Sequence, residues 1–569
     1  MLVWTVLAAL LSSSNGQMGI HPLTLDGVPG QPGLRIQLTQ RGANWTRQAL
    51  TEALFGLIPK LEIPDVSQSL GGQGILHLHA ISIYHYKAPD RTELSFRPPD
   101  GLHFGFYGLD ISIRGHIEGQ YMVLLPLELT GTFEILLEGW DLESTLRLRP
   151  PGRGSSQMLN LSLDQCRSSL RRLDFQLFNA GITGTALNLL REVVLDQIRP
   201  RLTGQVCSQL QRSFQNNIRQ YLARLPKAFP VLTGEQSLRS FTQMSSGLRN
   251  LNVLSMLDMD DDKERPGLKR VQRDEDEGIW ILLDLIRPPL VTPRMVELAS
   301  RGEMAWRWSG AARTEPTPFP PPFSPPLPLG DRSFTLILSD YPINSFLYHA
   351  YRHDMLTLKL SGGPSSDPRL RKFLRTTCPL DEILSCMGDF VEELGEVFPD
   401  RSVELEIVPL RAPAMIIRED GTVQSFFSAT ILLSMPELAD PLIQGDLVAV
   451  DADIQLDLSP NLSKDLKLSG TMSIEELELR LRRSVFPSFD DEALQELKPF
   501  IEAILSRMLG EMLEEGVSLP KVAGAGLANA RLSFAPRHLR LDADLFLDQE
   551  RLAQLLLRRM MAFNGFPAP

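Results

Sequence analysis

A proline-rich segment near the middle of the chain sets the strongest limit on the fold. Residues 316–328 contain eight prolines in thirteen positions, and proline neither continues a helix nor donates to the hydrogen-bond ladder of a central strand. We therefore expect an extended, semi-rigid polyproline spacer. It divides the 569 residues into two parts, each long enough to bury a core of its own.

The two parts repeat one order of elements. In the first, leucines at helical spacing over residues 45–61 precede alternating strand patterns that end at Pro150, and a helical period follows over residues 185–225. In the second, strand patterns over residues 333–361 precede a helix at 380–397, further alternation and a long amphipathic helix. The sequence thus predicts an α+β protein in which helices pack on twisted antiparallel sheets.

The first residues have the features of a secretory signal. An apolar run over residues 2–11 is followed by small residues, and a run of this length is too short to cross a bilayer, which takes about 20 residues. We assign residues 1–16 to a signal peptide and expect a secreted, extracellular protein. Three N-glycosylation sequons agree with export and begin at Asn44, Asn160 and Asn461.

Four cysteines are too few for a fold that depends on disulfides, and none belongs to a CxxC metal pair. The pairing of Cys378 with Cys386 stays open on spacing alone. If both lie in one helix their Cα atoms are about 12 Å apart, beyond the reach of a disulfide. A bridge requires Cys378 to precede the helix, which Pro379 permits as a first-turn residue.

Charge and missing motifs exclude several classes of function. The formal charge of −12 argues against a general nucleic-acid binder. The chain has no nucleophile elbow, phosphate-binding loop or metalloprotease HExxH motif. His349 and His353 have the i, i+4 spacing of that last motif, but Ala350 stands where its glutamate base belongs. The strand histidines His77, His79 and His85 lack a nearby carboxylate or cysteine. We therefore predict no enzyme, no catalytic residue and no metal site.

Short motifs in a fixed order give the chain a family resemblance. It resembles the family of bactericidal permeability-increasing protein, lipopolysaccharide-binding protein, cholesteryl ester transfer protein and phospholipid transfer protein, over residues 30–545. The motifs are Pro32-Gly33-Leu34-Arg35-Ile36, Gln40-Arg41-Gly42, Ile63-Pro64-Asp65-Val66-Ser67, Gln205-Val206-Cys207, the proline segment, Ser339-Asp340-Tyr341 and Gly516-Val517-Ser518-Leu519-Pro520.

The resemblance implies an elongated, boomerang-like molecule. It would contain two pseudo-repeated barrel-like domains, in which twisted antiparallel sheet wraps long helices. The two domains would share a central sheet, and each would enclose an apolar lipid pocket. A disulfide between Cys166 and Cys207 would fix the long helix to the sheet. The implied domains are 17–312, with an acidic loop at 258–277, a linker at 313–330, a second domain at 331–546 and a terminal amphipathic helix or tail at 547–569.

Pocket residues follow from combining this resemblance with the apolar helix stripes. The candidates for lipid contact are Leu50, Leu54, Leu57, Leu187, Leu190, Val194, Leu210, Phe214, Ile218, Ile501, Ile504 and Met508. Endotoxin-binding members of the family carry a lysine-rich tip on the first domain, whereas this chain has few lysines there. Guanidinium groups can replace lysine at a phosphate, and the candidates are Arg35, Arg41, Arg47, Arg91 and Arg97.

The resemblance leaves several activities open. One is a lipid-binding protein that holds phospholipid acyl chains and binds lipopolysaccharide or another anionic bacterial lipid in innate defence, at a bacterial membrane surface. Another is a transfer protein that moves phospholipid or neutral lipid between particles, gated by the terminal helix; that helix can equally dock elsewhere or form a tail. A third is a scaffold with structural lipid only. We expect bound phospholipid in place of a cofactor, and a monomer without nucleic acid.

Overall fold

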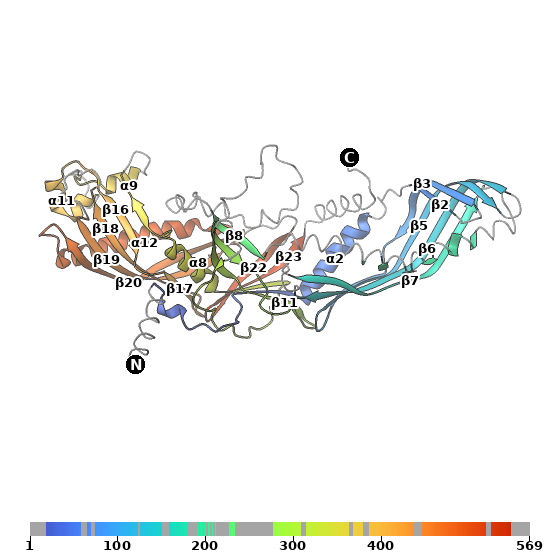
Figure 1. The fold of residues 1–569 in the computed structure, drawn as a ribbon, viewed down its shortest axis with the longest axis horizontal. Coiled ribbons are helices and arrows are strands. Elements are labelled where there is room, and N and C mark those ends of the chain that lie inside the picture. Colours follow the sequence, from blue (N-terminus) through green and yellow to red (C-terminus); the bar gives the residue numbers. More distant parts are fainter. Residues whose placement is uncertain are drawn as a thin grey trace, which may run out of the picture.

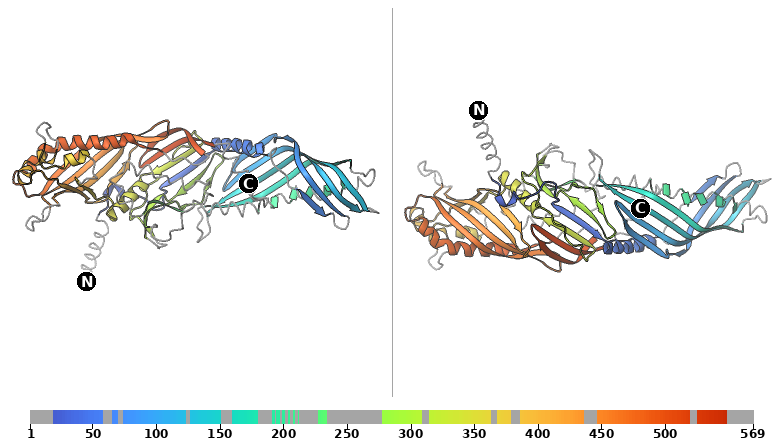
Figure 2. Two further views of the ribbon diagram at one scale, coloured as in Figure 1. Left: turned by 90° about the horizontal axis from the view of Figure 1, so that it is seen from above. Right: turned by 90° about the horizontal axis from the view of Figure 1, so that it is seen from below.

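The computed structural model of this protein describes most of the chain. The described residues are 19–57, 65–69, 74–122, 126–150, 159–179, short stretches between 191 and 211, 227–233, 277–308, 314–362, 368–378, 386–435, 446–518 and 525–547. They form an elongated α+β molecule in which antiparallel sheets follow one another along the long axis (Figure 1). Two long helices lie along one side of it (Figure 2).

The central sheet combines strands from both ends of the sequence. Its strand order is β10-β11-β1-β14-β23-β22. The strand β1 (Leu34–Thr39) pairs with β11 on one side and with β14 on the other, although β14 follows the proline-rich segment. The remaining bounds are Leu290–Val291 for β10, Met295–Ser300 for β11, Phe334–Ser339 for β14, Ala525–Ala535 for β22 and His538–Leu547 for β23. The two halves are therefore joined by backbone hydrogen bonds.

The amino-terminal half is built on a long antiparallel meander. Its strand order is β2-β3-β5-β6-β7, with β4 paired to β5. The bounds are Val66–Ser69, Gly74–Lys87, Arg91–Arg97, Gly101–Met122, Pro126–Arg149 and Asn160–Phe178 for β2 to β7. The helix α2 (Gln40–Leu57) packs on β4. The meander meets the central sheet where Phe96 and Leu148 pack against Val291 and Val296, so its opposite end is distal (Figure 1).

A small sheet lies beside the central one and precedes the proline-rich segment. Its order is β13-β12-β9-β8, with bounds Thr314–Glu315, Glu303–Arg307, Gly278–Leu282 and Ala228–Thr233. The helix α8 (Tyr341–Arg352) packs on β12 and β9 of this sheet. Residues 316–328 have no regular secondary structure, as eight prolines in this stretch predict.

The carboxyl-terminal half repeats the combination of a curved sheet and a long helix. The sheet order is β15-β16-β18-β19-β20-β21, with β17 paired to β18. The bounds for β15 to β21 are Leu358–Leu360, Glu404–Pro409, Ala414–Ile417, Val423–Ser434, Val448–Leu462, Lys467–Ser484 and Val517–Ser518. The helix α12 (Asp491–Glu515) packs on β20. Short helices at its side are α9 (Pro368–Phe373), α10 (Met387–Phe390) and α11 (Glu392–Val397).

Local chemistry explains the ends of α12. The Asp490 carboxylate accepts a hydrogen bond from the Ala493 amide at 3.0 Å, which satisfies a free donor of the first turn. The helix ends at Gly516, whose φ of 55° lies in the left-handed region that favours glycine. Within the described residues, none of the helices combines the length and apolar character that a membrane span requires.

Several sequence predictions are wrong in detail. The predicted strand region 333–361 contains the helix α8 between β14 and β15. Within the predicted helix 380–397, the described part consists of α10 and α11, which are separated at Val391. The sequence pattern predicts one strand that carries His77, His79 and His85 on a single side, but the pairing of β3 with β5 shifts register after His79 and again after Ile83.

Other predictions lie outside the described residues. These are the signal peptide 1–16, most of the helical period 185–225, nearly all of the acidic loop 258–277 and the terminal segment after Leu547.

Candidate functional site

The amino-terminal half contains an apolar interior between its meander, α2 and the segment that carries Cys207. Phe55 of α2 packs edge-on against Phe106 at 5.5 Å between ring centroids, and Phe106 in turn meets Trp140 at 5.8 Å. Leu109, Leu137, Leu142 and Leu173 are buried around them. Because strand side chains alternate between two faces, alternate residues of β5 and β6 contribute to this interior, and the register shifts between Phe106 and Ile111 change which residues these are.

A disulfide closes one side of this interior. Cys166 of β7 is bonded to Cys207, 41 residues later, with Cα atoms 5.5 Å apart. Both half-cystines and Leu195 pack against the buried cluster. This is the pairing that the family resemblance implies, and it joins the meander to the segment that follows it. A second disulfide joins Cys378 and Cys386, which settles the question that spacing left open. For a bridge, the sequence predicts that Cys378 alone precedes a helix, but the described helix α10 begins only at Met387, after both cysteines.

A strip of partly exposed apolar side chains borders the buried cluster. Ile113 of β5 and Ile135 of β6 are direct cross-strand neighbours, and both are half-buried. They continue toward a second small cluster of Ile117, Phe133 and Phe175, against which Val194 and Leu195 pack. These side chains point toward the interior but remain partly accessible to solvent. An apolar ligand can therefore bind by covering this accessible surface.

The carboxyl-terminal half has a corresponding interior. Buried side chains from α11, β18, β19 and β20 surround Leu394 and Leu447, and Leu494 joins them from α12. Ile501 packs half-buried against this cluster from the same helix. The same combination of long helix and curved sheet therefore encloses apolar surface in both halves.

The structure describes only part of the predicted pocket. Val194 and Ile501 pack against the apolar clusters, and their contact with lipid stays a prediction. Five further candidates lie within α2 or α12, but their side chains are outside the described part: Leu50, Leu54, Leu57, Ile504 and Met508. The others fall on residues outside the described ranges: Leu187, Leu190, Leu210, Phe214 and Ile218. Sequence reasoning missed Phe55, which is 8% exposed and follows directly after the predicted stripe residue Leu54.

The candidate arginines all have partners within the protein. The guanidinium of Arg35 is buried in the central sheet, 4.0 Å from Glu297 and bonded to the Pro325 carbonyl, so its proposed contact with lipid is wrong. Arg47 donates to Thr92, Arg91 lies over the Tyr107 ring, and Arg97 is 3.8 Å from Glu93. These arginines lie on α2 and β4, and β4 pairs with the part of β5 nearest the central sheet, away from the distal end of the meander.

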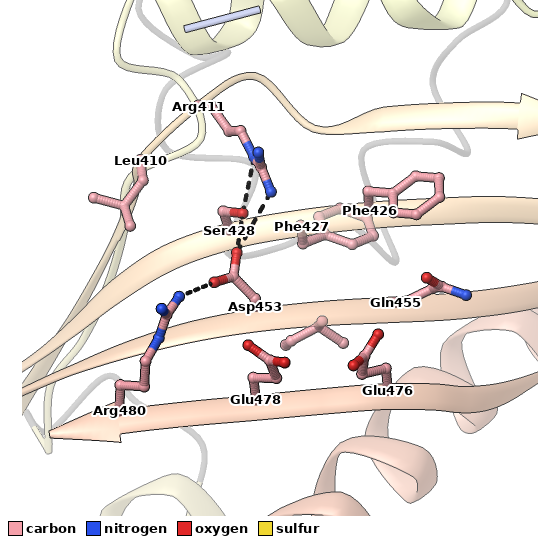
Figure 3. A pocket seen from close by; sticks show the side chains of 11 residues that line it. Leu410, Arg411, Phe426, Phe427, Ser428, Asp453, Gln455, Glu476, Glu478 and Arg480 are labelled. Atoms are coloured by element: carbon pink, nitrogen blue, oxygen red, sulfur yellow. Dashed lines mark hydrogen bonds and ion pairs between the residues drawn. The ribbon is translucent and has the colours of Figure 1, made fainter. Parts of the chain in front are cut away.

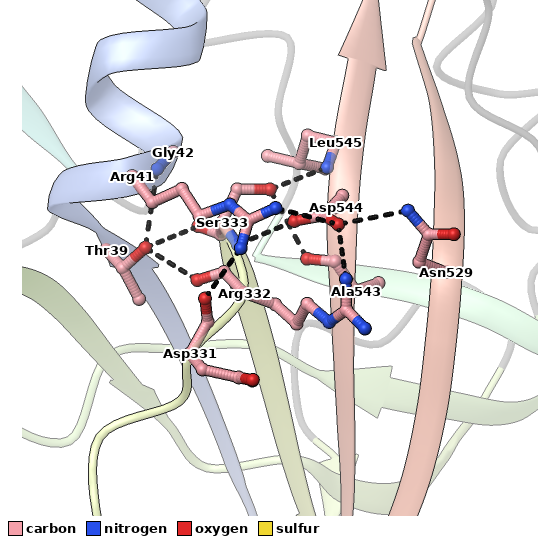
Figure 4. Close-up of polar contacts among 10 residues, drawn as sticks. All are labelled: Thr39, Arg41, Gly42, Asp331, Arg332, Ser333, Asn529, Ala543, Asp544 and Leu545. Carbon is pink, nitrogen blue, oxygen red and sulfur yellow. Dashed lines mark hydrogen bonds and ion pairs between the residues drawn. The ribbon is translucent and has the colours of Figure 1, made fainter.

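Arg41 belongs to a polar cluster that joins the two halves. The carboxylate of Asp544 on β23 accepts hydrogen bonds from Arg332 at 2.8 Å, Asn529 at 3.2 Å and Arg41 at 3.4 Å (Figure 4). Burial raises the pKa of Asp544, but the hydrogen bonds from Asn529 and Arg332 outweigh it and hold this pKa below its usual value. The cluster places the end of β23 beside the first turn of α2.

A groove of about 560 Å³ on the carboxyl-terminal sheet has a different character. Its floor is a chain of charged contacts, in which Asp453 receives a hydrogen bond from Arg480 at 2.6 Å and lies 3.5 Å from Arg411 (Figure 3). Phe426 at its rim stacks on His21, and burial together with Arg411 lowers the pKa of His21 to about 4. Carboxylates and guanidinium groups line this groove, so it is no acyl-chain pocket.

The predicted glycosylation sites differ in exposure. Asn44 on α2 and Asn461 on β19 are exposed, whereas Asn160 at the start of β7 is half-buried. The strand histidines remain separate: His77 bonds Ser67 at 2.8 Å, and His79 lies 3.8 Å from Glu118.

Comparisons with known proteins find similar chains. The model of the LBP/BPI/CETP family carboxyl-terminal domain matches residues 273–547. Rat bactericidal permeability-increasing protein is 22% identical over 523 residues, covering 90% of this chain and 93% of the relative. Human lipopolysaccharide-binding protein is 22% identical over 553 residues, covering 95% and 97%. A crystal structure of lipopolysaccharide-binding protein aligns over 91% of this chain and 100% of that chain, at 18% identity and a TM-score of 0.44.

The family model covers the carboxyl-terminal half, and the two full-length alignments extend the match across the amino-terminal half as well. The chain therefore belongs to the LBP/BPI/CETP family.

Proposed function

We propose that the chain is a secreted lipid-binding protein whose two interiors hold phospholipid acyl chains, and that it binds lipopolysaccharide or another anionic bacterial lipid in innate defence. The observation that carries this proposal is the half-buried apolar strip along β5 and β6, represented by Ile113 and Ile135. Two pseudo-repeated barrel-like domains, 17–312 and 331–546, would each enclose one interior.

The energetics favour acyl chains as the occupant. Each methylene moved from water into an apolar site gains about 0.8 kcal/mol, so one acyl chain covering the strip gains enough to offset the ordering of the lipid. The names of the relatives support a lipid ligand, since one of them is a lipopolysaccharide-binding protein. Proteins of this family are non-enzymatic, so the chain is no enzyme.

The charge pattern limits how a headgroup is held. Outward arginines of the meander are paired with carboxylates on the neighbouring strand, as Arg114 is with Glu134 at 2.5 Å and Arg172 with Glu138 at 3.4 Å. Paired charges on a surface attract a phosphate weakly. We therefore propose that burial of acyl chains supplies most of the affinity for bacterial lipid.

The transfer function remains the second candidate, because of where β23 ends. Arg41 of α2 contacts Asp544 near the end of this strand, so β23 ends beside the first turn of α2 and is followed in the sequence by the amphipathic segment 548–569. In this second candidate, the segment would gate the amino-terminal interior and the protein would exchange lipid between vesicles.

Filling the strip is expected to displace lipid from the amino-terminal half. Tryptophan at Ile113 and Ile135 adds bulk on paired positions of β5 and β6. In a closed core such overpacking costs about 1–3 kcal/mol, whereas in a lipid site it replaces the acyl chain. We expect the variant to fold and to lose about half of the co-purified phospholipid, because the carboxyl-terminal interior is unchanged. Quantitative lipid extraction from the purified protein measures this.

A matched control lies on the outer face of the same two strands. Glu118 and Thr130 are also direct cross-strand neighbours, and both are exposed. Tryptophan at these two positions should leave the lipid content unchanged. Equal lipid content in the two double variants would show that the strip holds no lipid.

A further inference from the structure

Three potential metal ligands converge where the proline-rich segment begins. His349 and His353 lie one helical turn apart at the end of α8, and Glu315 lies on β13. One ligand atom of each side chain lies within 4.8 Å of those of the other two. The i, i+4 spacing puts both histidines on one face of the helix, and the β12–β13 pairing brings the glutamate to that face.

The distances suit a tetrahedral ion. Two ligand atoms about 2.1 Å from a tetrahedral zinc ion are about 3.4 Å apart. The Nε2 atom of His353 and a carboxylate oxygen of Glu315 are separated by 3.4 Å. The third ligand, His349, offers a ring nitrogen within 4.8 Å of both other ligand atoms, and binding of the ion would draw it closer.

Neighbouring residues fix the positions of the two histidines but leave a buried ring nitrogen without a hydrogen-bond partner in the described structure. His349 is fully buried, and its Nδ1 has no hydrogen-bond partner within the described structure, while its Nε2 is 3.4 Å from the Thr317 hydroxyl. The Trp306 ring stacks on the His353 ring at 3.7 Å between centroids, which fixes the plane of that imidazole. A buried imidazole nitrogen without a partner is costly unless something binds it.

The local charge is compatible with a cation. Glu315 and Glu277 contribute negative charge around His353, and Arg352 opposes them from the same helix. The other convergent group, Cys378, Cys386 and Asp389, carries no comparable site, because its two sulfur atoms are joined in a disulfide.

We propose that Glu315, His349 and His353 bind one Zn²⁺ ion. Two imidazoles and one carboxylate are a common protein ligand set for zinc and leave the fourth position to water. The ion would tie β13, and with it the start of residues 316–328, to the end of α8. This proposal does not depend on the lipid-binding function.

Zinc titration of the full-length protein tests the site. The metal-free protein competes with a chromophoric chelator for Zn²⁺, and Co²⁺ serves as a spectroscopic probe of tetrahedral coordination. We expect one Zn²⁺ per chain and visible Co²⁺ absorption. The variants Glu315→Gln and His353→Gln should bind Zn²⁺ more weakly by about tenfold or more. Both side chains are partly exposed, at 26% and 22%, so these variants should fold.

The matched control uses another group of two histidines and a glutamate. His79 and His116 stack at 5.6 Å near Glu118 on the amino-terminal meander, but they do not converge as the proposed site does. His116→Gln should leave the zinc stoichiometry and affinity unchanged. Co²⁺ should quench tryptophan fluorescence, and Trp306→Phe should remove part of this signal, because Trp308 also lies beside His353, with 6.5 Å between the ring centroids. Zinc binding of equal strength in wild type, Glu315→Gln and His353→Gln, or no zinc binding by wild type, would overturn the proposal.

Discussion

Replacing Arg537 with leucine is expected to lower the free energy of unfolding by about 3–5 kcal/mol at pH 7.5. Arg537 lies in the turn between β22 and β23, and its guanidinium forms a two-point contact with the fully buried Asp340. It also donates to Asp26 at 2.5 Å and to the Leu23 carbonyl at 3.2 Å. Loss of the Arg537 guanidinium leaves the buried Asp340 carboxylate without its counter-ion. It also removes the contacts that hold the segment around Leu23 and Asp26.

The pH dependence separates this cause from a simple loss of packing. Burial raises the pKa of Asp340 from 3.8 to about 6 even though Arg537 opposes the shift. Because the folded-state pKa lies above the unfolded one, the native state binds the extra proton and gains stability as the pH falls through about 6 toward 3.8. Without Arg537 this pKa rises further, so the deficit of the variant should shrink as the pH falls. Denaturant unfolding at pH 7.5 and 5 measures it.

A surface arginine provides the control for this prediction. Arg418 lies 3.6 Å from Asp457 and is 45% exposed, so Arg418→Leu should cost less than about 1 kcal/mol. Arg537→Leu/Asp340→Asn, which removes both charges, should recover part of the loss. A deficit in Arg537→Leu that does not change with pH would contradict the role given to the Asp340 charge.

Removing the Cys166–Cys207 disulfide is expected to destabilise the amino-terminal half by about 4 kcal/mol. In the chain-entropy model this is the value for a closed loop of 41 residues. Replacement of both cysteines by serine avoids a free thiol. The interior cluster also loses its covalent link to the segment around Leu195, so we expect faster proteolysis of that segment and loss of bound lipid. Thermal unfolding and limited proteolysis measure these effects.

The second disulfide is a matched comparison. Cys378 and Cys386 close a loop of only 8 residues, for which the same model gives about 2.5 kcal/mol. Its double serine variant should therefore be less destabilised and should retain its lipid. A larger effect from the short loop would contradict the entropic account and the link between the long loop and the lipid site.

Long periodic elements could be predicted from the sequence, whereas short ones in mixed patterns could not. The 25 residues of α12 keep one apolar face, so the helix is evident from its period. The 12 residues of α8 lie between the strands β14 and β15, and the strand patterns on both sides hid them. Asp340 before the helix and Pro342 in its first turn were the available start signals.

Convergence of distant residues was beyond the reach of sequence patterns. His349 and His353 were visible as a pair, but Glu315 joins them only through the β12–β13 pairing. Ala350 follows His349 where a metalloprotease motif has its glutamate, so the sequence pattern indicated no metal site. Arg35 was chosen for its charge, and only the central sheet shows that it is buried. The Cys166–Cys207 pairing followed from family resemblance, not from spacing.

The most direct test of the lipid-binding account is native mass spectrometry of the protein secreted from eukaryotic cells, followed by lipid extraction. The account predicts a mass excess of two phospholipids per chain, which denaturation releases and extraction identifies. Addition of lipopolysaccharide should then give a bound species, whereas exchange between vesicles without such binding would favour the transfer function. Protein that carries no lipid would contradict the account.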